Sequence, residues 1–184
     1  MHSMGAGHRP LAGSVKGESV MYAIVYSSKT GNTKALAEAA RSALPEKDCV
    51  YLGPPDPKGA KADDILVGFW TDKGHCDKDM KAFLKGLEGK RIFLFGTAGF
   101  GGSEEYFNRI LESVRKDIPK SNTIIGTFMC QGKMPATVRQ RYESLLRLQP
   151  NKMKSMIENF DRALSHPDEQ DIQNMKEFVT AAFN

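Results

Sequence analysis

The sequence is poor in the residues on which small disulfide-linked and metal-binding domains depend. Only three of its 184 residues are cysteines, and Cys49, Cys76 and Cys130 form no Cys-x-x-Cys pair. The odd number and the wide spacing exclude a disulfide framework and give no zinc or iron–sulfur pattern. We therefore predict no metal site, and we expect the protein in a reducing compartment, the cytoplasm.

Long apolar runs are missing as well. Residues 1–20 are rich in glycine and serine and contain no apolar run of the length that a signal peptide or a membrane span needs. We expect these residues to be a disordered leader, either a cloning remnant or an upstream extension of the reading frame. Residues 21–184, in a chain that is 40% hydrophobic and 26% charged, are predicted to form one globular domain without a transmembrane segment.

A polar turn stands out between an apolar, strand-like run at residues 22–26 and a helix-like run at residues 33–44. Unpaired amides and the dipole of a helix start attract an anion, and side-chain hydroxyls add donors. A Walker A loop would end in Gly-Lys-Ser/Thr, and that ending is absent, so the turn suits one terminal phosphate better than a triphosphate. The alternative is an ordinary capped helix start. The turn reads Ser28-Lys29-Thr30-Gly31-Asn32-Thr33.

Five runs have strand length and strand composition, and helical patterns alternate with them. The strand-like runs are residues 22–26, 49–52, 65–70, 92–95 and 123–129. Asp77 and Ser103 are suited to cap two of the helices, whereas the Pro- and Gly-rich segment 53–62 predicts a brief or absent second helix. Residues 135–148, 152–164 and 168–183 are predicted to be helical. Alternating strands and helices favour a parallel sheet covered on both faces.

The Ser/Thr-x-Thr-Gly-x-Thr turn after the first strand resembles the FMN-phosphate loop of the flavodoxin family, and the likeness continues along most of the chain from Met21. The resemblance implies an α/β, flavodoxin-like three-layer αβα sandwich with a five-stranded parallel sheet in the order 2-1-3-4-5. It also implies that FMN binds at the carboxyl edge of the sheet through residues 28–33. Because flavodoxins begin at their first strand, Met21 resembles the natural start.

The loop after the third strand is implied to border the flavin ring. It contributes Trp70, Thr71, Asp72, Lys73 and Gly74. The customary stacking position falls nearer Asp72 than Trp70, so Trp70 is expected to border the ring, with a core aromatic as the alternative. In flavodoxins a backbone carbonyl of this loop bonds the N5–H of the flavin semiquinone. Gly74 or its neighbour is implied to do so here, with an ordinary glycine turn as the alternative.

The loop after the fourth strand is glycine-rich, and such a backbone can approach a flat ring closely and donate N–H groups to its pyrimidine edge. Phe100 is a candidate for the second face of the ring, with packing beneath its own loop as the alternative. The family's usual tyrosine is not evident at its position. The residues implied to bind cofactor here are Thr97, Ala98, Gly99, Phe100, Gly101 and Gly102.

The predicted function is that of a monomeric FMN protein that carries electrons between redox partner proteins, a reductase donor and an oxidoreductase acceptor. No catalytic set can be assembled from the motifs, and no nucleic-acid partner is expected. The net charge of +4 departs from the acidic character of flavodoxins. One alternative is an FMN oxidoreductase such as a protoporphyrinogen oxidase or quinone reductase, with residues 135–148 as a substrate or docking helix. Another is a flavin-free binding module. A packed amphipathic helix is the simpler interpretation of residues 135–148, and we favour it.

Overall fold

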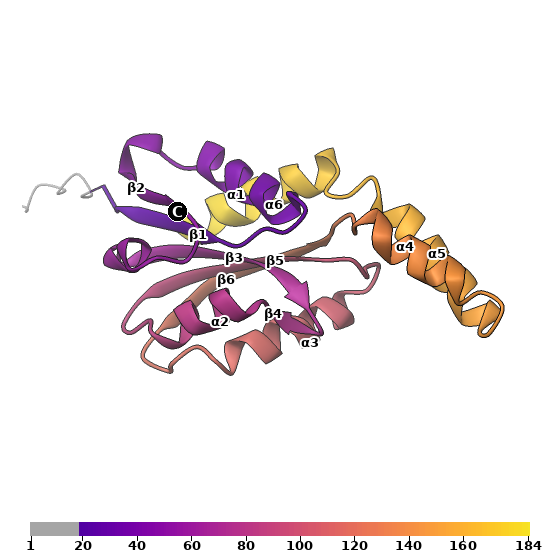
Figure 1. The fold of residues 1–184 in the computed structure, drawn as a ribbon. Coiled ribbons are helices and arrows are strands. Elements are labelled where there is room, and N and C mark those ends of the chain that lie inside the picture. The colour runs from indigo at the N-terminus through magenta and orange to yellow at the C-terminus, as the bar shows by residue number, and fades with distance from the viewer. Residues whose placement is uncertain (1–18) are drawn as a thin grey trace, which may run out of the picture.

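The computed structural model describes residues 19–184, and in them six strands form an α/β sheet. The strands are β1 (Tyr22–Tyr26), β2 (Cys49–Gly53), β3 (Asp64–Asp72), β4 (His75–Cys76), β5 (Arg91–Ala98) and β6 (Thr123–Gln131). Five of them run parallel in the order β2-β1-β3-β5-β6. This confirms the predicted 2-1-3-4-5 arrangement, and it places all five carboxyl ends at one edge of the sheet (Figure 1).

A short sixth strand adds to the predicted parallel sheet of five strands. β4 pairs antiparallel with the end of β3. Between them lies a two-residue turn, Lys73 (φ 50°) and Gly74 (φ 78°). Both residues are left-handed, as tight hairpin turns that match the sheet twist require. Trp70 and Thr71 are therefore strand residues, and the predicted loop is reduced to this turn.

β5 also continues further than predicted, through Ala98 instead of ending at Phe95. The reason lies in packing across the sheet. A Cβ on Gly96 would lie 2.5 Å from the ring of Phe69, and one on Gly68 would lie 2.3 Å from the ring of Phe95. These glycines let neighbouring aromatic rings lie flat on the strands, so Gly96 continues the strand instead of opening a loop.

Two helices cover each face of the sheet. α1 (Asn32–Ala43) and α6 (Glu169–Phe183) lie on one side, and α2 (Lys78–Lys85) and α3 (Glu104–Arg115) lie on the other (Figure 1). Alternate strand residues supply the two cores, with Ile24 and Phe93 facing α1 and α6 and Val25 and Leu94 facing the opposite pair. This confirms the three-layer sandwich.

The short connections follow local sequence signals. Asp77 accepts a hydrogen bond from the Met80 N–H at the start of α2, and Ser103 does the same for Tyr106 at the start of α3, so both predicted caps are confirmed. Besides η1 (Glu46–Asp48), one further 3-10 helix, η2 (Pro57–Lys61), stands where a second regular helix would lie. The second helix is thus as brief as predicted. A groove of about 580 Å³ lies between η2 and α2.

Between β6 and α6 the chain forms a helical hairpin, α4 (Ala136–Ser144) and α5 (Pro150–Ala163). The hairpin projects beyond the carboxyl edge of the sheet instead of covering either face (Figure 1). No residue of α4 is buried. The predicted helices at residues 135–148 and 152–164 are thus present, but they stand apart from the sandwich.

The predicted leader, residues 1–20, lies outside the described residues except for Ser19 and Val20. Ser19 Oγ donates to Asp48 Oδ1 at 2.6 Å. Among the described residues, no helix is both long and apolar enough to cross a membrane.

Candidate functional site

A cavity of about 130 Å³ lies at the carboxyl edge of the sheet, where the segments after β1 and β6 meet the ends of β3 and β5. We call it the edge cleft. Eight of its lining residues are among the predicted site residues, and four are not. The lining consists of Lys29, Thr30, Asn32, Trp70, Thr71, Thr97, Ala98 and Gly99, together with Gly132, Lys133, Met134 and Pro135.

The start of α1 supplies backbone donors beside the edge cleft. Its N-cap, Gly31, is left-handed (φ 86°) and has no side chain that could accept from the helix amides. The amide of Lys34 donates to Ser28 Oγ at 3.3 Å. The amides of Asn32 and Thr33 precede the first intrahelical hydrogen bond and have no partner within the helix. Together with the helix dipole, these amides favour an anion at this position.

Two side chains of this turn tie it to the segment after β6. Asn32 Nδ2 donates to Thr30 Oγ1 and to the Lys133 carbonyl, each at 2.8 Å. The Thr30 hydroxyl also lies 3.3 Å from that carbonyl. One carbonyl thus receives two donors from a turn about a hundred residues away in sequence.

Thr33 has a different role from the one its motif suggests. It is fully buried, and its hydroxyl lies 3.2 Å from the Phe69 carbonyl and 3.0 Å from Thr97 Oγ1. The side chain therefore fastens the start of α1 to the ends of β3 and β5 and does not line the edge cleft.

Trp70 and Thr71 line the edge cleft from the end of β3. Trp70 is half-buried, and Lys29 Nζ lies 5.1 Å from the centroid of its ring. This cation–π contact holds an ammonium group beside the aromatic face. The predicted site residues further along, from Asp72 to Gly74, belong to the β3–β4 hairpin and are not part of the cleft lining.

Thr97, Ala98 and Gly99 line the edge cleft from the end of β5, whereas Phe100, Gly101 and Gly102 lie beyond it. Phe100 is half-buried. A Cβ on Gly101 would lie 2.8 Å from the side chain of Gln131, so this glycine is required where the loop crosses β6.

The four lining residues that the site prediction omitted, Gly132 to Pro135, follow β6 directly. The Gly132 amide donates to the Ala98 carbonyl at 2.9 Å. The signal available in the sequence was their place after the last parallel strand, because the carboxyl ends of all parallel strands share one edge.

The hairpin is also fastened to the loop after β5. Asn159 of α5 is buried, with Nδ2 3.0 Å from the Gly99 carbonyl. Gln131 Nε2 donates to that carbonyl at 2.9 Å and to Asn159 Oδ1 at 3.0 Å. The α4–α5 hairpin is therefore fastened to the loop that supplies Gly99 to the edge cleft, although no hairpin residue lines the cleft itself.

Two buried oxygens beside the edge cleft have no hydrogen-bond partner within residues 19–184. They are Asn32 Oδ1 and Thr71 Oγ1, and both residues line the cleft. Buried polar atoms are nearly always satisfied, so these two favour a polar ligand. The open amides can donate to a phosphate, and the carboxamide oxygen of Asn32 can accept from a hydroxyl. These groups therefore fit a phosphorylated ligand that carries hydroxyl groups.

The cysteines offer no nucleophile here. Burial, followed in importance by the carboxylates of Asp171 and Asp168, raises the pKa of the Cys130 thiol near the edge cleft. Burial likewise raises the pKa of the Cys76 thiol to about 12. Both thiols stay protonated at neutral pH and lack nucleophilic character.

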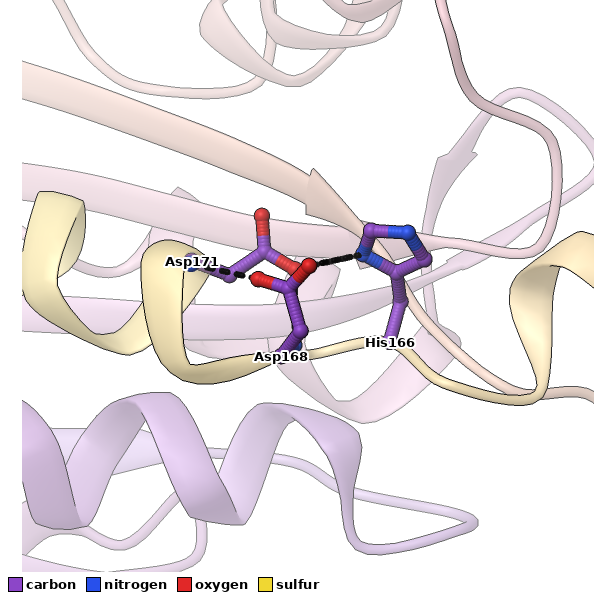
Figure 2. Close-up of side chains that lie close together, drawn as sticks. All are labelled: His166, Asp168 and Asp171. Carbon is purple, nitrogen blue, oxygen red and sulfur yellow. Dashed lines mark hydrogen bonds and ion pairs between the residues drawn. The ribbon is translucent and has the colours of Figure 1, made fainter.

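His166, Asp168 and Asp171 form the one group in the described residues whose ligand atoms lie close enough for a metal ion. Figure 2 shows the His166 ring turned toward the two carboxylates, and Nδ1 lies 2.6 Å from Asp171 Oδ2. Both carboxylates also accept backbone amides in the capping box of α6. Because the start of α6 already uses these oxygens, capping explains the cluster, and the prediction of no metal site stays a prediction.

The family comparison covers nearly the whole described chain. A family model described as "Flavodoxin domain" matches residues 23–180. The chain is 41% identical to the flavodoxin-like domain-containing protein BilS of Clostridium symbiosum, over 88% of this chain and 95% of that protein. It is 36% identical to BilS of Clostridioides difficile, over 85% and 92% of the two chains.

Solved structures agree on the fold. A short-chain flavodoxin associated with a PDU bacterial microcompartment matches at a TM-score of 0.58 with 17% identity, covering 89% of this chain and 97% of that one. A flavodoxin from Streptococcus pneumonia TIGR4 matches at a TM-score of 0.57 with 17% identity, covering 90% and 100%. These matches show the shared fold, and the family model and the two relatives establish that the chain belongs to the flavodoxin family.

Proposed function

We propose that this chain binds FMN at the edge cleft and uses it to carry electrons between partner proteins. The observation that carries the proposal is the uncapped start of α1, whose open amides stand beside the unpaired oxygens of Asn32 and Thr71. Amides at a helix start bind a phosphate, and the oxygens suit the hydroxyls of a ribityl chain.

In this proposal the residues after β1 hold the phosphate. The Thr30 hydroxyl would turn its proton from the Lys133 carbonyl to the phosphate, and Lys29 adds a positive charge. Thr33 acts indirectly, because its hydroxyl is bonded to Phe69 and Thr97 and keeps the helix start in place. No lysine ends the turn, so the site selects one phosphate over a triphosphate.

The ring of the flavin would lie toward Trp70, which borders the same cleft. When bound, FMN supplies one- and two-electron redox chemistry. The protein's contribution is to bind the phosphate and limit the access of water from the sides of β3, β5 and the hairpin. Lys29, which occupies the Trp70 face, would have to move for a ring to stack there.

A carrier fits better than an enzyme, because the residues around the edge cleft include two lysines and no acid–base pair. Of the twelve described residues that line it, none is a carboxylate, a histidine or a cysteine. The proposal therefore includes protein partners on both sides of the transfer, a monomeric carrier and a cytoplasmic location, where the three cysteines stay free thiols.

The first experiment titrates the apoprotein with FMN and with riboflavin. FMN is expected to bind at least tenfold more tightly, and Thr30→Ala should weaken FMN alone by about 1–3 kcal/mol, as for a donor to a charged group. Thr180→Ala is the matched control, since Thr180 is exposed on α6 and bonds only within its helix. Equal affinity for the two flavins would remove the phosphate assignment.

A second measurement separates a carrier from an enzyme. The FMN-loaded protein is mixed anaerobically with NAD(P)H, with quinones and with a porphyrinogen, and flavin absorbance is followed. A carrier should react slowly with each alone and rapidly with a reduced electron-transfer protein. Fast turnover with a quinone or a porphyrinogen in the absence of any protein partner would favour the reductase or oxidase alternative.

A further inference from the structure

The net charge of the molecule is concentrated in one element. Residues 133–163, which hold the hairpin and its first anchor, contain seven Lys or Arg and three Asp or Glu residues, a net +4. The whole chain also carries +4, so the remaining residues are balanced. The positive field of the protein therefore originates at the hairpin.

Most of the hairpin's cations are unpaired because its acids are used internally. Arg139 of α4 bonds Asp161 of α5, with Nε to Oδ1 at 3.0 Å, and it also pairs with Glu143. This joins the two helices and neutralises two of the three carboxylates. Five further cations, Arg141, Arg147, Lys152, Lys154 and Arg162, are exposed, and within residues 19–184 neither they nor the remaining acid, Glu158, have an ion pair.

These charges are held at a fixed place beside the edge cleft. The Lys133 carbonyl accepts from the turn after β1, and Asn159 donates to the loop after β5. The cleft itself adds Lys29 and Lys133. A partner attracted to the hairpin is thereby brought to the opening where a bound flavin would exchange electrons.

We infer that the α4–α5 hairpin is the docking surface for an acidic electron-transfer protein. The inference rests on the proposed carrier function. A charged surface next to the redox site raises the rate of productive encounter with a partner of opposite charge. A lipid surface is the competing occupant, because Leu148 at the tip between α4 and α5 is 77% exposed. It fits less well, because α4 presents only Val138 and Tyr142 as large apolar residues, and Met153 and Phe160 of α5 are buried.

The test uses an acidic [2Fe–2S] ferredoxin as the probe and the FMN-loaded protein as its partner. One electron passes from the reduced ferredoxin, which is oxidised, to the bound flavin, which is reduced. Stopped-flow absorbance gives the second-order rate at several ionic strengths. The triple variant R141E/K152E/K154E should lower this rate at least tenfold at low salt and remove its decrease with added salt.

The matched control reverses three exposed lysines that precede β2, β3 and β6, at the opposite edge of the sheet. These are Lys47, Lys61 and Lys120. The variant K47E/K61E/K120E has the same net charge as the hairpin variant, and its rate should stay within about threefold of the wild type. Equal losses in the two variants would show that only net charge matters, and no loss in either would overturn the inference.

Ferredoxin binding, measured by thermophoresis on flavin-free and FMN-loaded protein, separates this inference from the carrier proposal. Hairpin-dependent binding without electron transfer would retain the docking surface and reject the carrier function. If the protein binds FMN and accepts electrons equally well in the hairpin variant, the carrier function is retained and the docking surface is rejected. Two outcomes, each with ferredoxin rates unchanged in the hairpin variant, would replace the acidic protein by another occupant. If the wild type but not the hairpin variant sediments with phosphatidylserine vesicles, the occupant is a membrane. If the wild type but not the hairpin variant dimerises in ultracentrifugation, the occupant is a second copy of the chain.

Discussion

In the sandwich, α1 buries Leu36, Ala37 and Ala40 against the sheet, whereas α4 in the hairpin buries none of its nine residues. The two regions also differ in charge, because the hairpin segment accounts for the whole net +4. Apolar burial stabilises both faces of the sandwich, whereas in the hairpin it is confined to α5, where Met153 and Phe160 are buried, and it acts together with the Arg139 ion pairs and the hydrogen bonds at the base. Under the docking inference, the sandwich would supply most of the stability and the hairpin would supply the partner surface.

The largest expected effect tests the sandwich side of this comparison. Phe93→Ala removes a fully buried ring from the α1–α6 face and should lower the free energy of unfolding by about 3–5 kcal/mol. The hairpin counterpart, Val138→Ala on partly exposed α4, should cost less than about 1 kcal/mol. Urea unfolding followed by circular dichroism gives both values, and comparable losses would contradict the division of roles.

A deletion tests whether the sandwich folds without the hairpin. The Lys133 amide lies 3.0 Å from the His166 carbonyl, so a short Gly-Ser linker can replace residues 136–163. The variant should unfold cooperatively with a loss of about 1–3 kcal/mol, because the hydrogen bonds that Asn159 accepts from Gln131 and donates to the Gly99 carbonyl disappear.

The control for the deletion replaces α2 by the same linker. That variant should fail to fold, since Met80 and Leu84 are fully buried in the opposite core. A hairpin deletion that unfolds the chain as completely as the α2 deletion would show that the hairpin belongs to the folding core.

A smaller effect is expected at the junction of the two regions. Asn159→Ala leaves Gln131 Nε2 with one fewer partner and removes a donor to Gly99, so stability should fall by about 1–2 kcal/mol. Amide exchange in the loop from Gly99 to Gly102 should accelerate. Asn151 is exposed at the start of α5, so Asn151→Ala is the control and should leave the stability and the amide exchange unchanged. Unaltered exchange in Asn159→Ala would mean that the hairpin does not brace this loop.

The smallest effect concerns a surface ion cluster on the sandwich. Burial opposes ionisation of Asp117, but Lys81, Lys85 and His75 outweigh it and lower the pKa of its carboxyl. A lowered folded-state pKa stabilises the fold above the ordinary Asp pKa and loses that stabilisation as the pH falls through the folded value. Asp117→Asn should therefore cost under about 1 kcal/mol at pH near 7 and nothing at pH near 2. A loss that persists in acid would point to packing instead of charge.

Prediction from sequence succeeded where the cause is local. The apolar run at residues 22–26 gave β1 its observed bounds, and the caps at Asp77 and Ser103 lie where the helix-start signals indicated them. It failed at Gly96, because a glycine reads as a loop signal unless the Phe69 ring that needs its space is known. That ring comes from the neighbouring strand, and its position depends on the register of the sheet.

Several properties thus followed from the sequence by itself. The alternation of strands and helices depends on residue periodicity, and the expected anion-binding character of the turn after β1 depends on nearest-neighbour chemistry. The strand order came from the family resemblance. Only the tertiary structure decided that Thr33 turns inward, that Lys133 lines the edge cleft and accepts from Asn32, and that the basic segment projects as a hairpin fastened through Asn159. These contacts join residues about 30 to 100 positions apart. Such long-range pairing is fixed by packing of the whole sheet, which no local pattern encodes.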